Sequence, residues 1–313
     1  ASRDLDIELT WALAVIATAV SVIAYAAIGA LGRRVDGDRP PLILAPARAP
    51  ASRRHRTRDA LLTAVGAAAV LLVLWWGGIH AIGLSPFFAR TPADVVVILS
   101  GTADGGEVVG ALAAAIGETA ALAVPGYLAG LAAGAGLAIV LTLAPRAAAV
   151  SMPFAIALRA VPIVTTAPLV VLLLGRGAVG GVALVAVMVF FPTLIACLEG
   201  LRRAPGQALD VLRSYAAPAR VQLVRVRIPA MLPAFFAAAR MSVPAAVLAV
   251  TVVEWLALGS GVGSLMALAA SRSGYDLLAG AVVVVTALSA LGYALVSAVE
   301  ARVLRVYAPE QAT

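Results

Sequence analysis

Residues 207–220 read Gln207-Ala-Leu-Asp-Val-Leu-Arg-Ser-Tyr-Ala-Ala-Pro-Ala-Arg220, and residues 227–233 read Arg227-Ile-Pro-Ala-Met-Leu-Pro233. This polar, arginine-rich island separates two long apolar runs at 177–199 and 229–257. The apolar runs have the length and composition of helices that cross a lipid bilayer. The island has the composition of a segment that meets a protein at the membrane surface. Its setting therefore predicts a membrane protein with a surface for a partner.

The composition of the whole chain supports this interpretation. Of its 313 residues, 62% are hydrophobic and 12% are charged, and the mean hydropathy is +1.02. Ordinary soluble domains carry about 25% charged residues, so a soluble fold could not cover this much apolar surface. The net charge of +7 does not indicate nucleic-acid binding, because the basic residues lie in the gaps between apolar runs.

The residue types that the chain lacks exclude several kinds of enzyme. All 23 basic residues are arginines, and a phosphate-binding loop or a Schiff-base enzyme needs a lysine. The single cysteine, Cys197, allows no disulfide and no cysteine-based metal site. The two histidines, His55 and His80, are interpreted as solvated or interfacial residues. We therefore expect no catalytic residues, no metal site and no cofactor bound by this chain.

Seven apolar stretches are long enough to span a bilayer, and together they predict an all-α, polytopic membrane protein. Gly126, Gly130, Gly134 and Gly136 in the third stretch favour close approach of a neighbouring helix. The seven stretches lie at 9–31, 60–82, 113–143, 150–174, 177–199, 229–257 and 276–300.

The arginines predict the orientation of these spans. Alternating the seven spans places the linker 32–59, the loop 202–229 and the C-terminal Arg302 and Arg305 on one side. The opposite side carries most of the acidic residues outside the spans. By the positive-inside rule the arginine-rich side is cytoplasmic, so the N-terminus is outside and the C-terminus is inside.

The first span repeats part of the last one. A shift of 268 positions aligns Thr18, Ser21, Tyr25 and Arg34 with Thr286, Ser289, Tyr293 and Arg302. One hypothesis is that residues 1–35 are the last span of a preceding, similar unit in a tandem fusion. Low sequence complexity is the alternative source of the matches. Residues 36–59 are then a basic cytoplasmic linker.

The island predicts a helix, a turn and a second helix along the membrane surface. Leu209, Leu212, Ala216, Ala219 and Leu223 follow a helical spacing that gives one apolar stripe. Pro218 disfavours helix at the residue before it and suits the first turn of a new helix. A groove on a partner protein would hold such a segment. The alternative is an amphipathic helix held by lipid.

Here the chain resembles the conserved cytoplasmic loop of ABC-importer permeases. That loop reads Glu-Ala-Ala, three residues, Gly, nine residues and Ile-x-Leu-Pro. At the same spacing this chain has Asp210-Val211-Leu212, Ala216 and Val226-Arg227-Ile228-Pro229. Alanine replaces the family's glycine, and Ala217-Pro218 is expected to supply the turn instead.

Further motifs extend the resemblance from Trp75 to Arg305, and they are most similar to the nitrate/sulfonate/taurine-type permeases. These motifs are Arg90-Thr-Pro-Ala-Asp-Val95, Leu158-Arg-Ala-Val-Pro162, Phe190-Phe-Pro192, Val253-Glu254 and Gly259-Ser-Gly-Val-Gly263. The resemblance implies the type I ABC-importer permease fold, with six core transmembrane helices in a domain at 60–305. The span near the N-terminus is then an extra helix.

Three charged residues fall inside predicted spans, where an ionisable group usually faces a cavity or a partner. They are Arg159, Arg240 and Glu254. One hypothesis is that they line the translocation path together with Pro162, and that the arginines attract an anionic solute. The alternative is a structural ion pair of Glu254 with Arg159 or Arg240.

The resemblance implies a permease subunit of an ATP-driven, binding-protein-dependent importer in the bacterial cytoplasmic membrane, working by alternating access. It implies three partners besides lipid: a cytoplasmic ATPase dimer that uses ATP and magnesium, an extracytoplasmic binding protein or lipoprotein, and a second permease unit. The alternative is a secondary transporter or channel without ATP, and the sequence does not identify the solute. The residues expected to contact the ATPase are Asp210, Val211, Leu212, Arg213, Tyr215, Ala216, Ala217, Pro218, Arg220, Ile228 and Pro229.

Overall fold

The computed structural model describes residues 53–83, 85–101, 105–144, 173–175 and 177–307, and it contains helices but no strand in these ranges. The chain divides into two compact units, Ala1–Leu62 and Thr63–Thr313. Helix α2 (Arg53–Ile82) crosses this division, and every other described element belongs to the second unit. The predicted extra helix at 9–31 and most of the predicted span at 150–174 lie outside the described residues.

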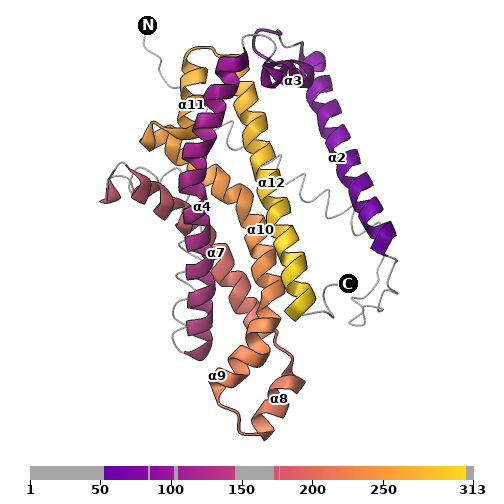
Figure 1. Ribbon diagram of the computed structural model, residues 1–313, viewed down its shortest axis with the longest axis vertical. Helices are drawn as coiled ribbons and strands as arrows, with labels where there is room; N and C mark the ends of the chain where they lie inside the picture. The colour runs from indigo at the N-terminus through magenta and orange to yellow at the C-terminus, as the bar shows by residue number, and fades with distance from the viewer. Residues whose placement is uncertain (1–52, 84, 102–104, 145–172, 176, 308–313) are drawn as a thin grey trace, which may run out of the picture. The chain divides into compact units, whose positions relative to one another are not determined.

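Long apolar helices form the body of this unit, as Figure 1 shows. Among the residues that the structure describes, four helical stretches are long and apolar enough to cross a membrane: Gly106–Leu143, Ala178–Arg202, Ala219–Leu258 and Tyr275–Arg305. The first, second and fourth belong to α4 (Gly105–Leu143), α7 (Ala178–Arg202) and α12 (Tyr275–Tyr307). The third joins α9 (Ala219–Gln222), η1 (Leu223–Arg227), α10 (Ile228–Val253) and η2 (Glu254–Leu258). The predicted spans at 113–143, 177–199, 229–257 and 276–300 are thus confirmed as helices.

Shorter helices lie toward the two ends of the long ones. Helix α8 (Gly206–Ser214) and α9 occupy one end in Figure 1, and α3 (Pro92–Ser100) and α11 (Gly261–Ser271) lie toward the other. Helix α2 (Arg53–Ile82) covers the predicted span at 60–82. The sequence interpretation did not foresee α3 or α11, because each is too short to cross a bilayer.

The tightest helix contact joins α4 to α7, and glycines make it possible. A Cβ added to Gly130 would lie 2.5 Å from the carbonyl oxygen of Ala186. Gly126 and Gly134 meet α7 in the same way, whereas Gly136 faces open space. The expected close approach is therefore confirmed for three of the four glycines. Small residues at every fourth position let the two backbones touch.

The core continues from α7 to α10. Leu194, Leu198 and Leu201 on α7 are buried, and they cluster with Met231 on α10. Gly200 allows this contact, since an added Cβ would lie 2.9 Å from the Cα of Met231. The packing holds the first half of α10, which follows the arginine-rich stretch, firmly against α7. Helix α10 is thus a rigid continuation of the loop that precedes it.

Candidate functional site

The arginine-rich loop, defined as residues 202–229, folds as the sequence predicted into a helix, a turn and a second helix. Helix α8 ends at Ser214, and α9 begins at Ala219 directly after Pro218. Pro218 is extended, with φ −64° and ψ 156°, and its carbonyl oxygen accepts the first bonds of the new helix from Val221 and Gln222. The proline is therefore the N-cap residue of the second helix, directly before its first helical residue.

The turn itself is made at Ala216, and this corrects the sequence interpretation. Ala216 has a φ of +52°, in the left-handed region. Its N–H donates to Arg213 at 2.9 Å, and the N–H of Ala217 donates to Leu212 at 3.0 Å. These two bonds form a Schellman motif, in which glycine is the preferred residue. Ala217-Pro218 does not replace the left-handed residue; Ala216 adopts that conformation despite its Cβ.

Two sides of this loop differ in exposure. Leu209 and Leu223 are buried, and Leu212 is half-buried, so the predicted apolar stripe holds at these positions. Ala216 and Ala219 are exposed, so the stripe does not extend over the turn. On the other side Val211 is 57% exposed and Tyr215 is 81% exposed. Val211 and Tyr215, four positions apart, therefore place apolar and aromatic surface on the exposed side of the loop.

The loop is joined to the transmembrane body without a break. Helices α9, η1 and α10 follow one another from Ala219 to Val253, with Ile228 and Pro229 at the junction. The side-chain amide of Gln222 donates to the carbonyl oxygen of Ala217 at 2.9 Å and closes the turn. The ion pair of Asp210 with Arg213 spans 3.0 Å on an exposed surface, where such pairs contribute little.

Arg240 lies on α10 and pairs with Glu300 on α12. The side chain of Glu300 is 12% exposed and that of Arg240 is 31% exposed. The alternative that Arg240 pairs with Glu254 is wrong, because its carboxylate partner is Glu300. The sequence did not point to Glu300, since it falls at the edge of the last apolar run. Arg159 and Pro162 lie outside the described residues.

Glu254 is fully buried and holds the N-terminus of α11. Its Oε2 accepts hydrogen bonds from the Thr119 hydroxyl at 3.0 Å and from the Gly263 N–H at 2.9 Å. Thr119 in turn accepts from the Val262 N–H at 3.0 Å. Glycine is needed at Gly261, because an added Cβ would lie 2.1 Å from Oε1 of Glu254. Side chains from α4 and η2 thus satisfy the free N–H groups of α11.

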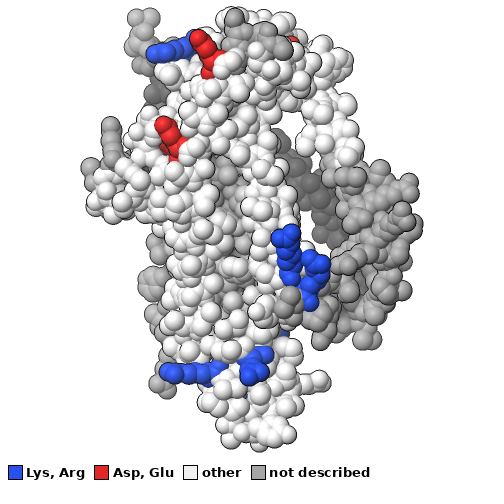
Figure 2. All heavy atoms as spheres, in the orientation of Figure 1, with Lys and Arg blue, Asp and Glu red and all other residues white. Residues whose placement is uncertain are grey.

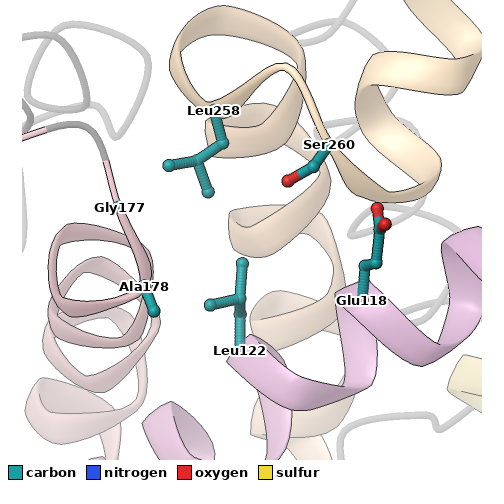
Figure 3. Close-up of a pocket in the computed structure, with 6 residues that line it drawn as sticks. All are labelled: Glu118, Leu122, Gly177, Ala178, Leu258 and Ser260. Atoms are coloured by element: carbon teal, nitrogen blue, oxygen red, sulfur yellow. The ribbon is translucent and has the colours of Figure 1, made fainter.

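Glu118 completes this arrangement and faces open space. Its Oε2 accepts from the Gly261 N–H at 2.7 Å. Two cavities meet at its carboxylate: one of about 200 Å³ toward Leu122 and Leu258, seen in Figure 3, and one of about 670 Å³ toward Trp255. The sequence interpretation assigned neither Glu118 nor Thr119 to a site. Their signal was two adjacent polar residues inside an apolar run.

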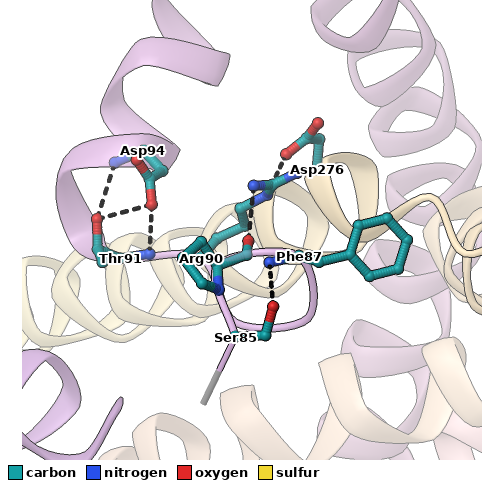
Figure 4. Close-up of polar contacts among 7 residues, drawn as sticks. Ser85, Phe87, Arg90, Thr91, Asp94 and Asp276 are labelled. Carbon is teal, nitrogen blue, oxygen red and sulfur yellow. Dashed lines mark hydrogen bonds and ion pairs between the residues drawn. The ribbon is translucent and has the colours of Figure 1, made fainter. Parts of the chain in front are cut away.

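The end of the bundle that carries α3 is held by polar contacts, shown in Figure 4, and by contacts between aromatic rings. Arg90 pairs with Asp276, the second residue of α12, at 2.5 Å. Thr91 and Asp94 form a reciprocal capping box at the start of α3. The ring of Tyr275 packs edge-on against Phe87 and Phe88, with centroids 5.4 and 5.3 Å away. These contacts connect the segment before α3 to α12.

Comparison with known sequences matches residues 126–305 to a family described as binding-protein-dependent transport system inner membrane component. The matched stretch contains the arginine-rich loop, Arg240, Glu254 and α11. Glu118 and Thr119 precede it by a few residues.

Individual relatives agree with this family. A Haemophilus influenzae protein named a probable ABC transporter permease is 33% identical over 165 residues, which are 52% of this chain and 67% of that protein. A Bacillus subtilis protein, named provisionally as an aliphatic sulfonates transport permease, is 29% identical over 62% of this chain and 69% of its own length. A formylaminopyrimidine transport permease of Halalkalibacterium halodurans is 31% identical over 36% of this chain and 44% of its own length.

Proposed function

Because the chain belongs to the binding-protein-dependent transport system inner membrane components, the permease subunits of ABC importers, we propose that its arginine-rich loop couples the membrane helices to a separate ATPase. The family membership favours this function over that of a secondary transporter. It also makes the chain a transport subunit rather than an enzyme, with ATP hydrolysis in another chain.

The observation that carries the proposal is the exposure of the loop combined with its rigid connection to α10. Val211 and Tyr215 offer an apolar and aromatic surface on the side away from the buried Leu209. A groove on a partner could receive this surface as it receives other amphipathic helices. Any displacement of α9 passes directly into α10, since the helices are continuous. The exposed residues from Asp210 to Arg220 therefore form the proposed contact, and Ile228 and Pro229 form its junction with the membrane helix.

The mechanism that we propose is alternating access. Two ATP-binding subunits would close on ATP and magnesium and move the arginine-rich loop. The long helices would then reorient and expose the solute path to the other side. A second permease unit, either another copy or a fused one, would complete the path. Arg159, Pro162, Arg240 and Glu254 remain the proposed path residues from this chain.

The distribution of charge supports the proposed orientation. On the face shown in Figure 2, acidic side chains lie toward the end that carries α11, and most of the arginines gather toward the end that carries α8 and α9. By the positive-inside rule the loop end is cytoplasmic and the end with α3 and α11 is outside. An extracytoplasmic binding protein would deliver its solute at the α3 end.

A negative charge introduced at the loop tip tests the proposal. Tyr215→Glu should abolish copurification of the ATP-binding subunit and ATP-driven uptake, because a charge would replace the exposed ring. Tyr307→Glu is the matched control, since Tyr307 is also exposed, at 63%, but lies at the end of α12. Equal retention of the ATP-binding subunit by both variants would contradict the proposal. Equal loss in both would show that the effect is not specific to the loop.

A further inference from the structure

The larger cavity at Glu118 has no role in the coupling proposed above. It holds about 670 Å³ between α4, η2 and α11. Small side chains on α4, such as Ala111, Ala114 and Ala115, form one wall. Ser260 and Ser264 contribute hydroxyl groups from the opposite wall. A cavity of this size, with apolar walls and a few polar groups, is of the kind that holds a small molecule.

Its electrostatic character is negative. Glu118 is the one charged side chain among the described residues that line it. The carboxylate of Glu118 is exposed to the cavity and uses Oε2 for the Gly261 N–H. A second carboxyl, that of Glu254, lies directly behind Gly261, and its Oε1 has no hydrogen-bond partner among the described residues. Glu118 lies within the candidate membrane span Gly106–Leu143, and an ionisable group within such a span commonly marks a ligand path.

The indole of Trp255 lines the same cavity and is 59% exposed. An indole face attracts a cation through its ring quadrupole, and a nearby carboxylate adds a direct charge interaction. The hydroxyls of Ser260 and Ser264 can accept N–H bonds from an amine. Carboxylate, indole and hydroxyl oxygens together suit a positively charged nitrogen, and they do not suit an anion.

We infer that this cavity binds a cationic group, an amine or a quaternary ammonium, on the solute that the transporter carries. The inference rests on the proposed permease function and names the class of solute for it. An acidic group elsewhere on the same solute is compatible with the role predicted for Arg159. The competing explanation is that Glu118 does no more than cap α11. The two explanations make opposite predictions for two conservative variants.

Glu118→Gln keeps an oxygen that accepts from Gly261 and loses the charge. Glu118→Asp keeps the charge, but its shorter side chain does not reach Gly261 as well. The test uses the complete chain in lipid nanodiscs, with Trp11, Trp75 and Trp76 replaced by phenylalanine so that Trp255 reports alone. The probes are tetramethylammonium, tert-butanol as a neutral molecule of similar size, and methanesulfonate. Thermal unfolding of each variant is measured alongside.

We expect tetramethylammonium to change the Trp255 fluorescence saturably, and tert-butanol and methanesulfonate to leave it unchanged. Glu118→Gln should weaken the binding of tetramethylammonium at least about tenfold and leave thermal unfolding unchanged. Glu118→Asp should bind tetramethylammonium with an affinity within about threefold of the parent. Glu107→Gln, on the same helix but outside the cavity lining, should match the parent. The inference is overturned if Glu118→Gln binds tetramethylammonium as the parent does or if Glu118→Asp binds it more weakly than Glu118→Gln. It is also overturned if methanesulfonate binds instead. Copurification of the ATP-binding subunit does not depend on these results, so the proposed function can stand or fall separately.

Discussion

The hydroxyl of Thr119 donates to Oε2 of Glu254 across 3.0 Å, although the two residues are 135 positions apart. The same hydroxyl oxygen accepts from the Val262 N–H. Thr119 therefore joins α4, η2 and α11 through a single side chain. A buried carboxyl and a helix N-terminus both depend on it.

Loss of this hydroxyl should destabilise the protein. In Thr119→Val the Val262 N–H loses its acceptor and Glu254 loses a donor, so we expect a cost of about 1–3 kcal/mol. Thr119→Ser should retain most of the stability, because it keeps the oxygen. Thermal unfolding in detergent measures the difference. Thr286→Val is the control, since that hydroxyl bonds only within its own exposed helical turn; an equal loss there would contradict the assignment.

The ion pair of Arg240 with Glu300 should show coupling in a double-mutant cycle. Arg240→Gln or Glu300→Gln alone leaves a half-buried charge without its partner and should cost about 1–3 kcal/mol. The double variant should cost less than the sum of the two, because no unpaired charge remains.

Uptake by the same variants separates a structural role from a role in the path. If Arg240 serves only the pair, the double variant should transport better than Arg240→Gln alone. If Arg240 also attracts solute, Glu300→Gln will not restore uptake. Strictly additive stability changes would show that the pair does not couple the two helices.

The sequence predicted local features of this protein better than the contacts between distant segments. Four of the seven predicted spans are long apolar helices in the described part of the chain, because a segment that crosses a bilayer must satisfy its backbone groups internally. The spacing from Leu209 to Pro218 predicted the helix and turn of the loop, because both are local. The partners of Arg240 and Glu254 could not be predicted, since they depend on how α4, α11 and α12 pack. Ala216 was misjudged because its left-handed backbone is fixed by two cap bonds rather than by its residue type.

Ala216→Gly should stabilise the loop. A left-handed residue other than glycine costs about 1–2 kcal/mol, and glycine removes most of that cost, so a gain of about 1 kcal/mol is expected. Hydrogen exchange of the α8 amides should slow accordingly. Ala217→Gly should speed exchange, since Ala217 has a negative φ and would only gain freedom in the unfolded chain. Slower exchange in both variants would argue against the cap.

The capping box of α3 should respond to acid. The backbone N–H and the hydroxyl of Thr91 donate to Asp94 at 2.8 Å and lower the pKa of that carboxyl below its ordinary value. Because this pKa is lowered, the contribution of the Asp94 carboxylate to stability is complete above its ordinary pKa, about 4. That contribution is lost as the pH falls through the lower pKa that the group has in the folded protein. The protection factors of the α3 amides, which are the exchange rates corrected for their intrinsic dependence on pH, should therefore fall at low pH. Asp94→Asn should exchange without this pH dependence, and a wild-type profile identical to it would refute the assignment.

Close contact of α4 with α7 should make Gly130 intolerant of a methyl group. Its Cβ would lie 2.5 Å from the Ala186 carbonyl oxygen and 2.8 Å from Cβ of Val189, and backbone atoms cannot move aside without separating the helices. Gly130→Ala should therefore cost about 1–3 kcal/mol in thermal unfolding. Gly136→Ala on the same helix faces open space and should be neutral or stabilising, because alanine favours helix over glycine by about 1 kcal/mol. If the two substitutions shift the unfolding temperature equally, the α4–α7 contact is looser than these distances require.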